Sequence, residues 1–471
     1  MHLRTITDIS KRPNVILINC DDLGYGDLGC YGSQRNQSPN IDRLAKHGLQ
    51  LNSFYMMSPV CSASRAAMLT GCYPQRIGFG PHSVLFPGAS KGIHETEVTL
   101  GHVAQAAGYQ TKIIGKWHCG DQPEFLPTNR GFDEYFGIPY SNDMGRQLNN
   151  EGVMREIPRP PLPLLLDDQV IQQQPDQRGI TERYTDEAVR FIEDHQAEPF
   201  FLYLAHMYVH VPLFVPQQFL KQSKNGAYGG AVAAIDWSTG VIVDRLKKLG
   251  LFENTLIIFT SDNGSRARDE GGSNAPCNGT KASTWESGQR VPGILHWPDG
   301  IQPGNVSDEL VRSADFLPSI ASLINSPCRP DKAIDGIDLS GFITGQTTTT
   351  GIDTFYYYSF ASLCAVRKGD WKLHLSRRDE PNLCELYNLR DDVGETKNVA
   401  DANPHIVEEL QRLAEGVRLR FGDSIQEVEG SEVRPCGHSD NAVALTEYDP
   451  THPYMIACYD LADADMKTME G

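Results

Sequence analysis

The stretch NVILINCDD, residues 14–22, is a compact apolar run that ends in two aspartates. Its β-branched residues and its length predict a buried strand of a parallel sheet over residues 14–20. In open α/β sheets, ligands bind at the carboxyl ends of the strands, where Asp21 and Asp22 would stand. The stretch therefore predicts a buried sheet with a polar site at one edge.

Helical and strand patterns alternate downstream of this first strand. A helix start signal and a terminal glycine mark residues 38–48, and an amphipathic pattern marks residues 182–195. The full set of predicted helices is 38–48, 100–108, 182–195 and 232–250, and strands are predicted at 109–115, 199–205 and 254–261. The alternation predicts an α/β fold with a large, mostly parallel sheet flanked by helices.

The length of 471 residues favours two domains. The alternating pattern weakens after a stretch rich in Gly and Thr at 336–354, and residues 363–375 look like two strands around a Lys-Gly-Asp turn. We therefore expect a catalytic α/β domain at 12–350 and a smaller C-terminal α+β domain with an antiparallel sheet at 351–471. The Pro-rich stretch 159–168 is expected to be a surface loop of the large domain.

Charge and hydropathy limit the partners and the compartment. The net charge of −18 argues against nucleic acid and anionic membranes, which need basic patches. No apolar run approaches the roughly 20 residues that span a bilayer. The N-terminus has no apolar stretch of the signal-peptide type, so the sequence as written predicts a cytoplasmic protein, or a periplasmic or secreted one if a leader was trimmed.

One cysteine stands apart by its setting. The chain has eleven cysteines, an odd number, and no CxxC pair. Cys61 opens the Ala-rich stretch CSASRAAMLTG, residues 61–71, which reads as a short helix. At a helix N-terminus the thiol pKa is lowered, which would suit a reactive group. A buried small residue is the equally open alternative.

Acidic and amide side chains also follow a second predicted strand. Asp262 and Asn263 end the run TLIIFTSDNG, as Asp21 and Asp22 end the first run. Oxygen ligands of this kind suit Ca²⁺ or Mg²⁺. Each pair alone is equally explained as a turn former. Two pairs at one sheet edge favour a metal site, because clustered carboxylates repel one another.

Cationic side chains gather after other predicted strands. A single lysine is usually a solvated charge and a single histidine is usually structural. Placed together on the ligand edge, they would instead form the pocket that an acidic protein needs to bind an anion. These residues are Arg65, Lys116, His118, His206, His210, Lys281 and Arg290.

The segment CSASRAAMLTG resembles the signature of the type I sulfatases of the alkaline phosphatase superfamily. The family pattern is Cys or Ser, any residue, Pro or Ala, Ser, then Arg and a terminal Thr-Gly. Ala63 stands where Pro is commoner, which hints at a bacterial maturation system of the anaerobic type. Ser287 stands where a second Gly usually follows the Glu. Other blocks in family order are residues 12–32, 38–55, 115–120, 131–143, 210–212, 260–264 and 283–298, and residues 371–375 and 386–400 resemble the C-terminal domain.

The resemblance implies an alkaline phosphatase-like fold and a particular chemistry at Cys61. The family converts this cysteine to formylglycine (3-oxoalanine), an aldehyde that hydrates to a gem-diol and attacks sulfur. A maturation enzyme that generates formylglycine is then a required partner. The resemblance also implies a metal shell, usually around Ca²⁺ with Mg²⁺ as the other candidate, made by Asp21, Asp22, Cys61, Asp262 and Asn263.

The remaining roles implied by the resemblance follow from residue type. Lys116 and Lys281 would bind the sulfate oxygens, with Ser141 nearby. Arg65 would orient the diol and the acids. His210 would protonate the leaving alcohol, helped by Lys281, and His118 would take the proton that lets the bound sulfate leave by elimination. His206 matches no family position and is expected to be structural.

The predicted activity is hydrolysis of a sulfate ester, as in arylsulfatases. The block 131–143 resembles the arylsulfatase A and N-acetylgalactosamine-6-sulfatase group, so the expected substrate is a sulfated carbohydrate from glycosaminoglycan or algal polysaccharide. Asn142, Asp143 and Arg146 are candidate sugar contacts by position. The alternatives are a phosphonate or phosphodiester hydrolase of the same superfamily, and a non-catalytic binder of sulfated glycans with an unmodified Cys61.

Overall fold

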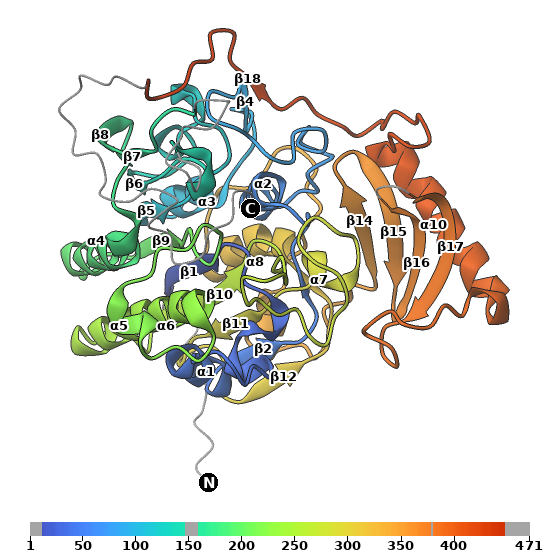
Figure 1. The fold of residues 1–471 in the computed structure, drawn as a ribbon, viewed down its shortest axis with the longest axis horizontal. Coiled ribbons are helices and arrows are strands. Elements are labelled where there is room, and N and C mark those ends of the chain that lie inside the picture. Colours follow the sequence, from blue (N-terminus) through green and yellow to red (C-terminus); the bar gives the residue numbers. More distant parts are fainter. Residues whose placement is uncertain (1–11, 147–158, 378–379, 448–471) are drawn as a thin grey trace.

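The computed structural model describes residues 12–146, 159–377 and 380–447, and its two main sheets, of ten and four strands, are accompanied by two small sheets of two strands each (Figure 1). The large sheet has ten strands in the order β12-β2-β11-β10-β1-β9-β5-β6-β7-β8. Its five central strands, β10 to β6, are parallel. The strand bounds are β1 Asn14–Cys20, β2 Leu49–Leu51, β5 Gln110–Gly115, β6 Glu134–Gly137, β7 Pro163–Leu166, β8 Gln169–Gln173, β9 Phe200–Ala205, β10 Thr255–Ser261, β11 Gly293–His296 and β12 Asn305–Ser307.

Helices cover both faces of the large sheet (Figure 1). Side chains alternate along β1, so Ile16 and Ile18 pack with α1, α4 and α6, while Val15 and Leu17 pack with α2, α3 and α8. β1 is buried on both faces, as its unbroken apolar sequence predicts. The main helices are α1 Pro39–Lys46, α2 Cys61–Thr70, α3 Leu100–Ala106, α4 Ile180–Asp194, α6 Gly226–Lys248 and α8 Phe316–Leu323.

α6 begins six residues before the helix expected at 232–250. Its first turns contain glycines, which disfavour helix, so the sequence pattern starts only after them. Tertiary packing explains their presence: a Cβ on Gly230 would lie 2.9 Å from Cγ1 of Val215. None of the helices in the described part of the chain is both long enough and apolar enough to cross a membrane.

A second, antiparallel sheet of four strands forms the C-terminal part, with α10 packed against it (Figure 1). β15 and β16 are joined at the predicted Lys-Gly-Asp turn. The predicted fold class is confirmed, whereas the division at residues 350 and 351 remains a prediction. The elements are β14 Thr354–Ser359, β15 Ser362–Lys368, β16 Trp371–Arg377, β17 Glu380–Asn388 and α10 Pro404–Phe421.

One expectation is wrong: residues 159–168 are not simply a surface loop. Pro163–Leu166 form β7, which pairs with β6 and β8 at the edge of the large sheet, and its first three residues are buried. Proline suggested a loop, but Pro163 is the first residue of a strand near the sheet edge, where a missing N–H is tolerated.

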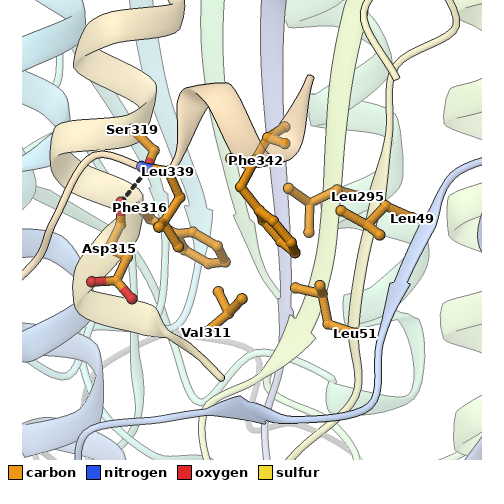
Figure 2. A pocket seen from close by; sticks show the side chains of 10 residues that line it. Leu49, Leu51, Leu295, Val311, Asp315, Phe316, Ser319, Leu339 and Phe342 are labelled. Atoms are coloured by element: carbon orange, nitrogen blue, oxygen red, sulfur yellow. Dashed lines mark hydrogen bonds between the residues drawn. The ribbon is translucent and has the colours of Figure 1, made fainter. Parts of the chain in front are cut away.

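A small apolar cavity lies where the helices after β13 (Val311–Arg312) meet β2 and β11 (Figure 2). Its volume is about 10 Å³, which is room for about one water, and its lining is mostly aliphatic and aromatic. Leu49, Leu51, Leu295 and Phe316 contribute to it, and all are buried. The cavity is a packing defect of the core, away from the polar edge of the sheet.

Candidate active site

The carboxyl ends of β1 and β10 bring four polar side chains together. The two strands are parallel neighbours, and Cys20 pairs with Ser261, so the residues that follow each strand lie side by side. The backbone N–H of Asp22 donates to Oδ1 of Asp262 over 3.3 Å, and Nδ2 of Asn263 donates to Oδ1 of Asp22 over 2.7 Å. All these side chains are buried.

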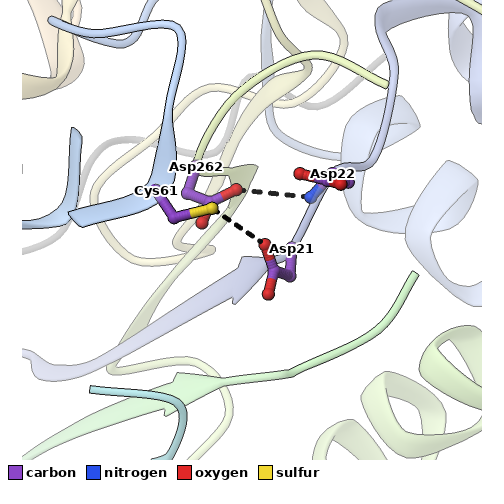
Figure 3. A group of neighbouring side chains, drawn as sticks. All are labelled: Asp21, Asp22, Cys61 and Asp262. Atoms are coloured by element: carbon purple, nitrogen blue, oxygen red, sulfur yellow. Dashed lines mark hydrogen bonds between the residues drawn. The ribbon is translucent and has the colours of Figure 1, made fainter. Parts of the chain in front are cut away.

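Cys61 joins this group from the start of α2 (Figure 3). Its Sγ lies 3.7 Å from Oδ1 of Asp21. One ligand atom each from Asp21, Asp22, Cys61 and Asp262 lies within 4.8 Å of the others. The helix start did not lower the thiol pKa as expected: burial raises the pKa of Cys61 to about 12, although Lys116 and Lys281 act in the opposite direction. The unmodified thiol is therefore protonated at neutral pH.

Arg65, one turn into α2, binds the Asp262 carboxylate with its guanidinium group. Its Nε and Nη2 both lie 2.8 Å from Oδ2 of Asp262, and its Nη1 donates to the carbonyl oxygen of Lys116 over 2.8 Å. The Ser64 hydroxyl donates to the carbonyl oxygen of Asp262 over 2.5 Å. α2 thus holds Cys61 and the end of β10 in a fixed relation through charge-assisted hydrogen bonds.

Two lysines each contact one carboxylate of this group, Lys116 at Asp21 and Lys281 at Asp22. Nζ of Lys116, just after β5, lies 2.5 Å from Oδ2 of Asp21 and 3.3 Å from Oγ of Ser141. Nζ of Lys281 lies 3.0 Å from Oδ2 of Asp22. Burial opposes the charge on Lys116, but Asp21 raises its pKa overall, so the ammonium persists. Likewise Asp22 raises the pKa of Lys281 against the effect of burial.

The two predicted acid–base histidines have different surroundings. Nε2 of His210 lies 3.8 Å from Oδ2 of Asp22, and its ring lies 3.4 Å from Oγ of Ser141. Nε2 of His118 lies 2.9 Å from the carbonyl oxygen of Leu85 and must be the protonated nitrogen. Nδ1 of His118 is buried and has no hydrogen-bond partner among the described residues. Burial and Lys116 lower the pKa of His118 well below its usual value, so it is a neutral ring with a free lone pair.

Asn142 has a different place from the one predicted. Instead of lining a sugar site, it is buried, with Nδ2 donating to Oε1 of Gln177 over 3.1 Å and to the carbonyl oxygen of Pro212 over 3.0 Å. Its Oδ1 lies 3.1 Å from Nδ1 of His210. Nδ1 of His210 also lies 2.6 Å from the carbonyl oxygen of Val211, so both neighbours of Nδ1 are acceptors. Asn142 therefore helps to fix the ring of His210, a role that no local pattern signalled.

His206 lies outside this arrangement. It is buried, and burial alone lowers its pKa to about 4. Neither ring nitrogen has a hydrogen-bond partner among the described residues. It is thus a neutral core histidine, as expected for a residue that matches no family position.

The donor set at the strand ends suits a hard divalent cation. Oδ1 of Asn263 is buried and lacks a hydrogen-bond partner within the part of the chain that the structure describes, although Nδ2 of the same amide is satisfied. A buried, unused carbonyl oxygen beside three carboxylates is the environment that Ca²⁺ or Mg²⁺ selects. The ten cysteines within the described ranges are all free thiols, so disulfides hold none of this site together.

Two family models and several known proteins match most of this chain. A family model described as Sulfatase matches residues 13–326, and one described as N-sulphoglucosamine sulphohydrolase, C-terminal, matches residues 280–418. The chain is 37% identical to arylsulfatase A of Homo sapiens over 86% of this chain and 87% of the relative. It is 37% identical to N-acetylgalactosamine-6-sulfatase of Mus musculus over 85% of this chain and 79% of the relative.

Solved structures agree in fold. The crystal structure of Ps i-CgsB in complex with k-i-k-neocarrahexaose matches with a TM-score of 0.75 and 30% identity, over 86% of this chain and 93% of that one. The carboxylate, cysteine and lysine positions, the family model and the relatives all lead to one conclusion. The chain belongs to the sulfatase family, whose members hydrolyse sulfate esters.

Proposed function

We propose that this sulfatase cleaves the sulfate ester of a carbohydrate, using a formylglycine made from Cys61. The observation that carries the proposal is the convergence of Cys61 with acids from two strand ends and with two buried lysines. The acids suit a cation and the lysines suit an anion, so one small site is equipped for both.

The state of the Cys61 thiol supports its conversion. Burial keeps the pKa of the thiol at about 12, so the unmodified residue offers almost no thiolate at neutral pH. A protonated thiol is a weak nucleophile and a weak metal ligand. Oxidation to formylglycine by a maturation enzyme would provide, on hydration, a nucleophilic hydroxyl at the same position.

A divalent cation would be held by Asp21, Asp22, Asp262 and Asn263, together with residue 61. Calcium is our first choice and magnesium the second, because the donors are oxygen atoms. When bound, such a cation supplies charge stabilisation to the sulfate group and lowers the pKa of the attacking hydroxyl. Arg65 keeps the Asp262 carboxylate in place for this purpose.

The sulfate group would be bound by Lys116 and Lys281. Both ammonium groups lie at the acids in this structure, and an entering sulfate would compete with Asp21 and Asp22 for them. Ser141 lies within reach of both Lys116 and His210 and offers one further hydrogen bond. Preorganised cations of this kind stabilise the charge that develops in the transition state.

Proton transfer would be divided between the two histidines. His210, fixed through Nδ1 by Asn142 and the Val211 carbonyl, leaves Nε2 as the atom that donates a proton to the leaving alcohol. His118 is a neutral base at Nδ1, suited to take the proton whose removal lets sulfate depart and the aldehyde return. The role of His118 requires a neutral ring, which burial and the nearby Lys116 favour by lowering its pKa.

A carbohydrate substrate is supported by the relatives and by one nearby acid. The relatives include an N-acetylgalactosamine-6-sulfatase and a structure solved with neocarrahexaose. Burial acts against ionisation of Asp143, but His210 and Lys281 lower its pKa overall, so a carboxylate faces the cationic pocket. Asp143 and Arg146 stay our candidates for contacts to a sugar, and Asn142 does not.

The decisive experiment has two parts. Mass spectrometry of the peptide containing residue 61, after co-expression with a formylglycine-generating enzyme, should show loss of the thiol in favour of an aldehyde. The matured protein should then release sulfate from a panel of sulfated sugars and aryl sulfates faster than it cleaves phosphodiesters or phosphonate esters. Faster cleavage of phosphodiesters, or turnover with an intact Cys61 thiol, would contradict the proposal.

A further inference from the structure

The segment 278–290 carries Lys281 and is pinned to the active site by its backbone. The N–H of Lys281 donates to the carbonyl oxygen of Ser265 over 3.0 Å, and the N–H of Ala282 donates to that of Pro59 over 2.9 Å. Ser265 follows the metal-binding end of β10, and Pro59 lies two residues before Cys61. The position of the Lys281 ammonium group therefore depends on the position of this segment.

The other end of the segment is the short helix α7, Glu286–Gln289, whose first residue is a buried acid. The Glu286 carboxylate accepts hydrogen bonds from the hydroxyl groups of Tyr55 and Tyr357, the latter over 2.6 Å. Nζ of Lys372, on β16, donates to Glu286 Oε1 over 3.1 Å. Burial raises the pKa of Glu286, but Lys372 and the nearby arginines lower it overall, so the acid is ionised.

A second buried acid from the C-terminal part completes this junction cluster, which we define as Glu286, Lys372, His374 and Glu395. Oε2 of Glu395 accepts from the backbone N–H of Glu286 over 2.7 Å. Its Oε1 lies 2.9 Å from Nζ of Lys372 and 2.7 Å from Nε2 of His374. Lys372 on β16 thus holds α7 by the Glu286 side chain, and Glu395 in the loop after β17 holds it by the Glu286 backbone.

α7 packs tightly against the backbone next to the active site. The hydroxyl of Ser287 donates to the carbonyl oxygen of Asn278 over 2.5 Å, which closes the segment on itself. The N–H of Gly264 donates to the carbonyl oxygen of Gly288 over 3.2 Å. A Cβ on Gly264 would lie 1.7 Å from the carbonyl oxygen of Ser287, so the two backbones are in direct contact. A shift of α7 must move the segment that holds Lys281.

We propose that Lys372, on β16, and Glu395, in the loop after β17, are positioning residues for Lys281, acting through Glu286 and the segment 278–290. The inference rests on the proposed role of Lys281 in binding sulfate. It assigns the C-terminal part of the chain a role in the reaction, although its described residues make no hydrogen bond or ion pair with Lys116 or Lys281.

The test measures sulfate binding and local protection in the matured protein. Lys372→Met should raise the inhibition constant of inorganic sulfate and the KM of an aryl sulfate by about tenfold, with a smaller change in kcat, because a charge-assisted contact to the bound group is weakened. Hydrogen exchange of the amides in 278–290 should become faster. Lys372→Arg keeps the charge and should restore most of both properties.

Two further variants keep the test valid if Lys372→Met folds poorly. Glu286→Gln combined with Lys372→Met removes both charges of the Lys372–Glu286 pair and leaves one buried carboxylate, Glu395, which keeps its hydrogen bond with His374. Arg418→Met is the matched control, because Arg418 makes a partly buried pair with Asp423 in the same C-terminal part, 2.9 Å from Nε to Oδ2. It should leave the sulfate constant and the exchange of 278–290 unchanged.

The two proposals fail in different ways. If a folded Lys372→Met protein and the double variant both keep wild-type sulfate inhibition and wild-type exchange in 278–290, the positioning role is wrong. If the wild-type protein with formylglycine at residue 61 releases no sulfate, the proposed function is wrong. In that case the exchange measurement still decides whether Lys372 holds the Lys281 segment.

Discussion

Two buried groups of charges lie close together in this protein, and they differ in how well their polar atoms are satisfied. In the junction cluster, both oxygens of Glu286 and both of Glu395 have hydrogen-bond partners. At the strand ends, Oδ1 of Asn263 has none among the described residues, whereas a buried histidine Nδ1 without a partner occurs in both groups, at His118 and at His374. Burial of an unpaired polar atom is costly, and such atoms persist where something else binds. The unpaired amide oxygen of Asn263 therefore distinguishes the strand ends, where an oxygen-binding cation would fit, from the junction cluster.

The largest expected effect is the loss of activity when Cys61, the proposed precursor of the nucleophile, is replaced. Cys61→Ala should lower sulfate release by roughly 10⁴-fold or more, because the nucleophile and its activated hydroxyl are lost. Turnover of an aryl sulfate after co-expression with a maturation enzyme measures this. Cys72→Ala is the matched control, since Cys72 is a buried thiol just past the other end of α2 and should retain activity. Comparable activity of Cys61→Ala would place the chemistry elsewhere.

Substitutions in the junction cluster should mainly lower the free energy of unfolding. Lys372→Met leaves two buried carboxylates facing each other and should cost about 3–5 kcal/mol of unfolding free energy. Adding Glu286→Gln should recover part of this loss, because the remaining charges are fewer and still hydrogen-bonded. Urea unfolding of wild type, both single variants and the double variant gives the coupling energy. Additive single effects would show that the pair does not interact as the geometry indicates.

Metal binding tests the group of acids at the ends of β1 and β10. Chelation should abolish sulfate release and Ca²⁺ should restore it. Calcium at 100 times its Kd should stabilise the protein by about 2.7 kcal/mol if it binds the folded state alone. Asp262→Asn should remove this calcium-dependent rise in Tm, whereas Asp194→Asn, at an exposed acid, should keep it. A calcium effect that survives Asp262→Asn would move the metal away from the strand ends.

The smallest effect concerns pH and the junction cluster. Burial lowers the pKa of His374 from 6.5 to about 4, despite its contact with Glu395. The folded state therefore favours the neutral ring, so its stabilising contribution is complete above pH 6.5 and is lost as pH falls through about 4. The loss between pH 7 and pH 5 should be about 2 kcal/mol.

The matched variants for this prediction are His374→Gln and His405→Gln. Urea unfolding at both pH values should show a smaller acid loss in His374→Gln than in wild type. His405 is exposed, and its replacement should not change the slope. Equal slopes for all three proteins would mean that the His374 ring accepts its proton as easily in the folded state as in the unfolded state.

Part of the fold and part of the active site could be predicted from local sequence. The apolar run of β1, the terminal acids of β1 and β10, and the signature around Cys61 predicted a sheet edge where these residues meet, and the structure brings them within a few ångströms. The buried role of Asn142 and the strand β7 were not predicted. Asn142 meets His210 across 68 positions of sequence, and β7 gains its order by pairing with β6.

The sequence by itself determined four central strands of the large sheet, several of the helices, the fold class and the family, because hydrophobic periodicity and short motifs are local properties. Only the tertiary structure decided which polar atoms are satisfied and which are left unpaired. It also decided that Glu395 and Lys372, from the C-terminal part of the chain, bind the helix α7. The reason is physical: desolvation and hydrogen bonding of a buried group depend on every segment packed around it, and those segments are far apart in the chain.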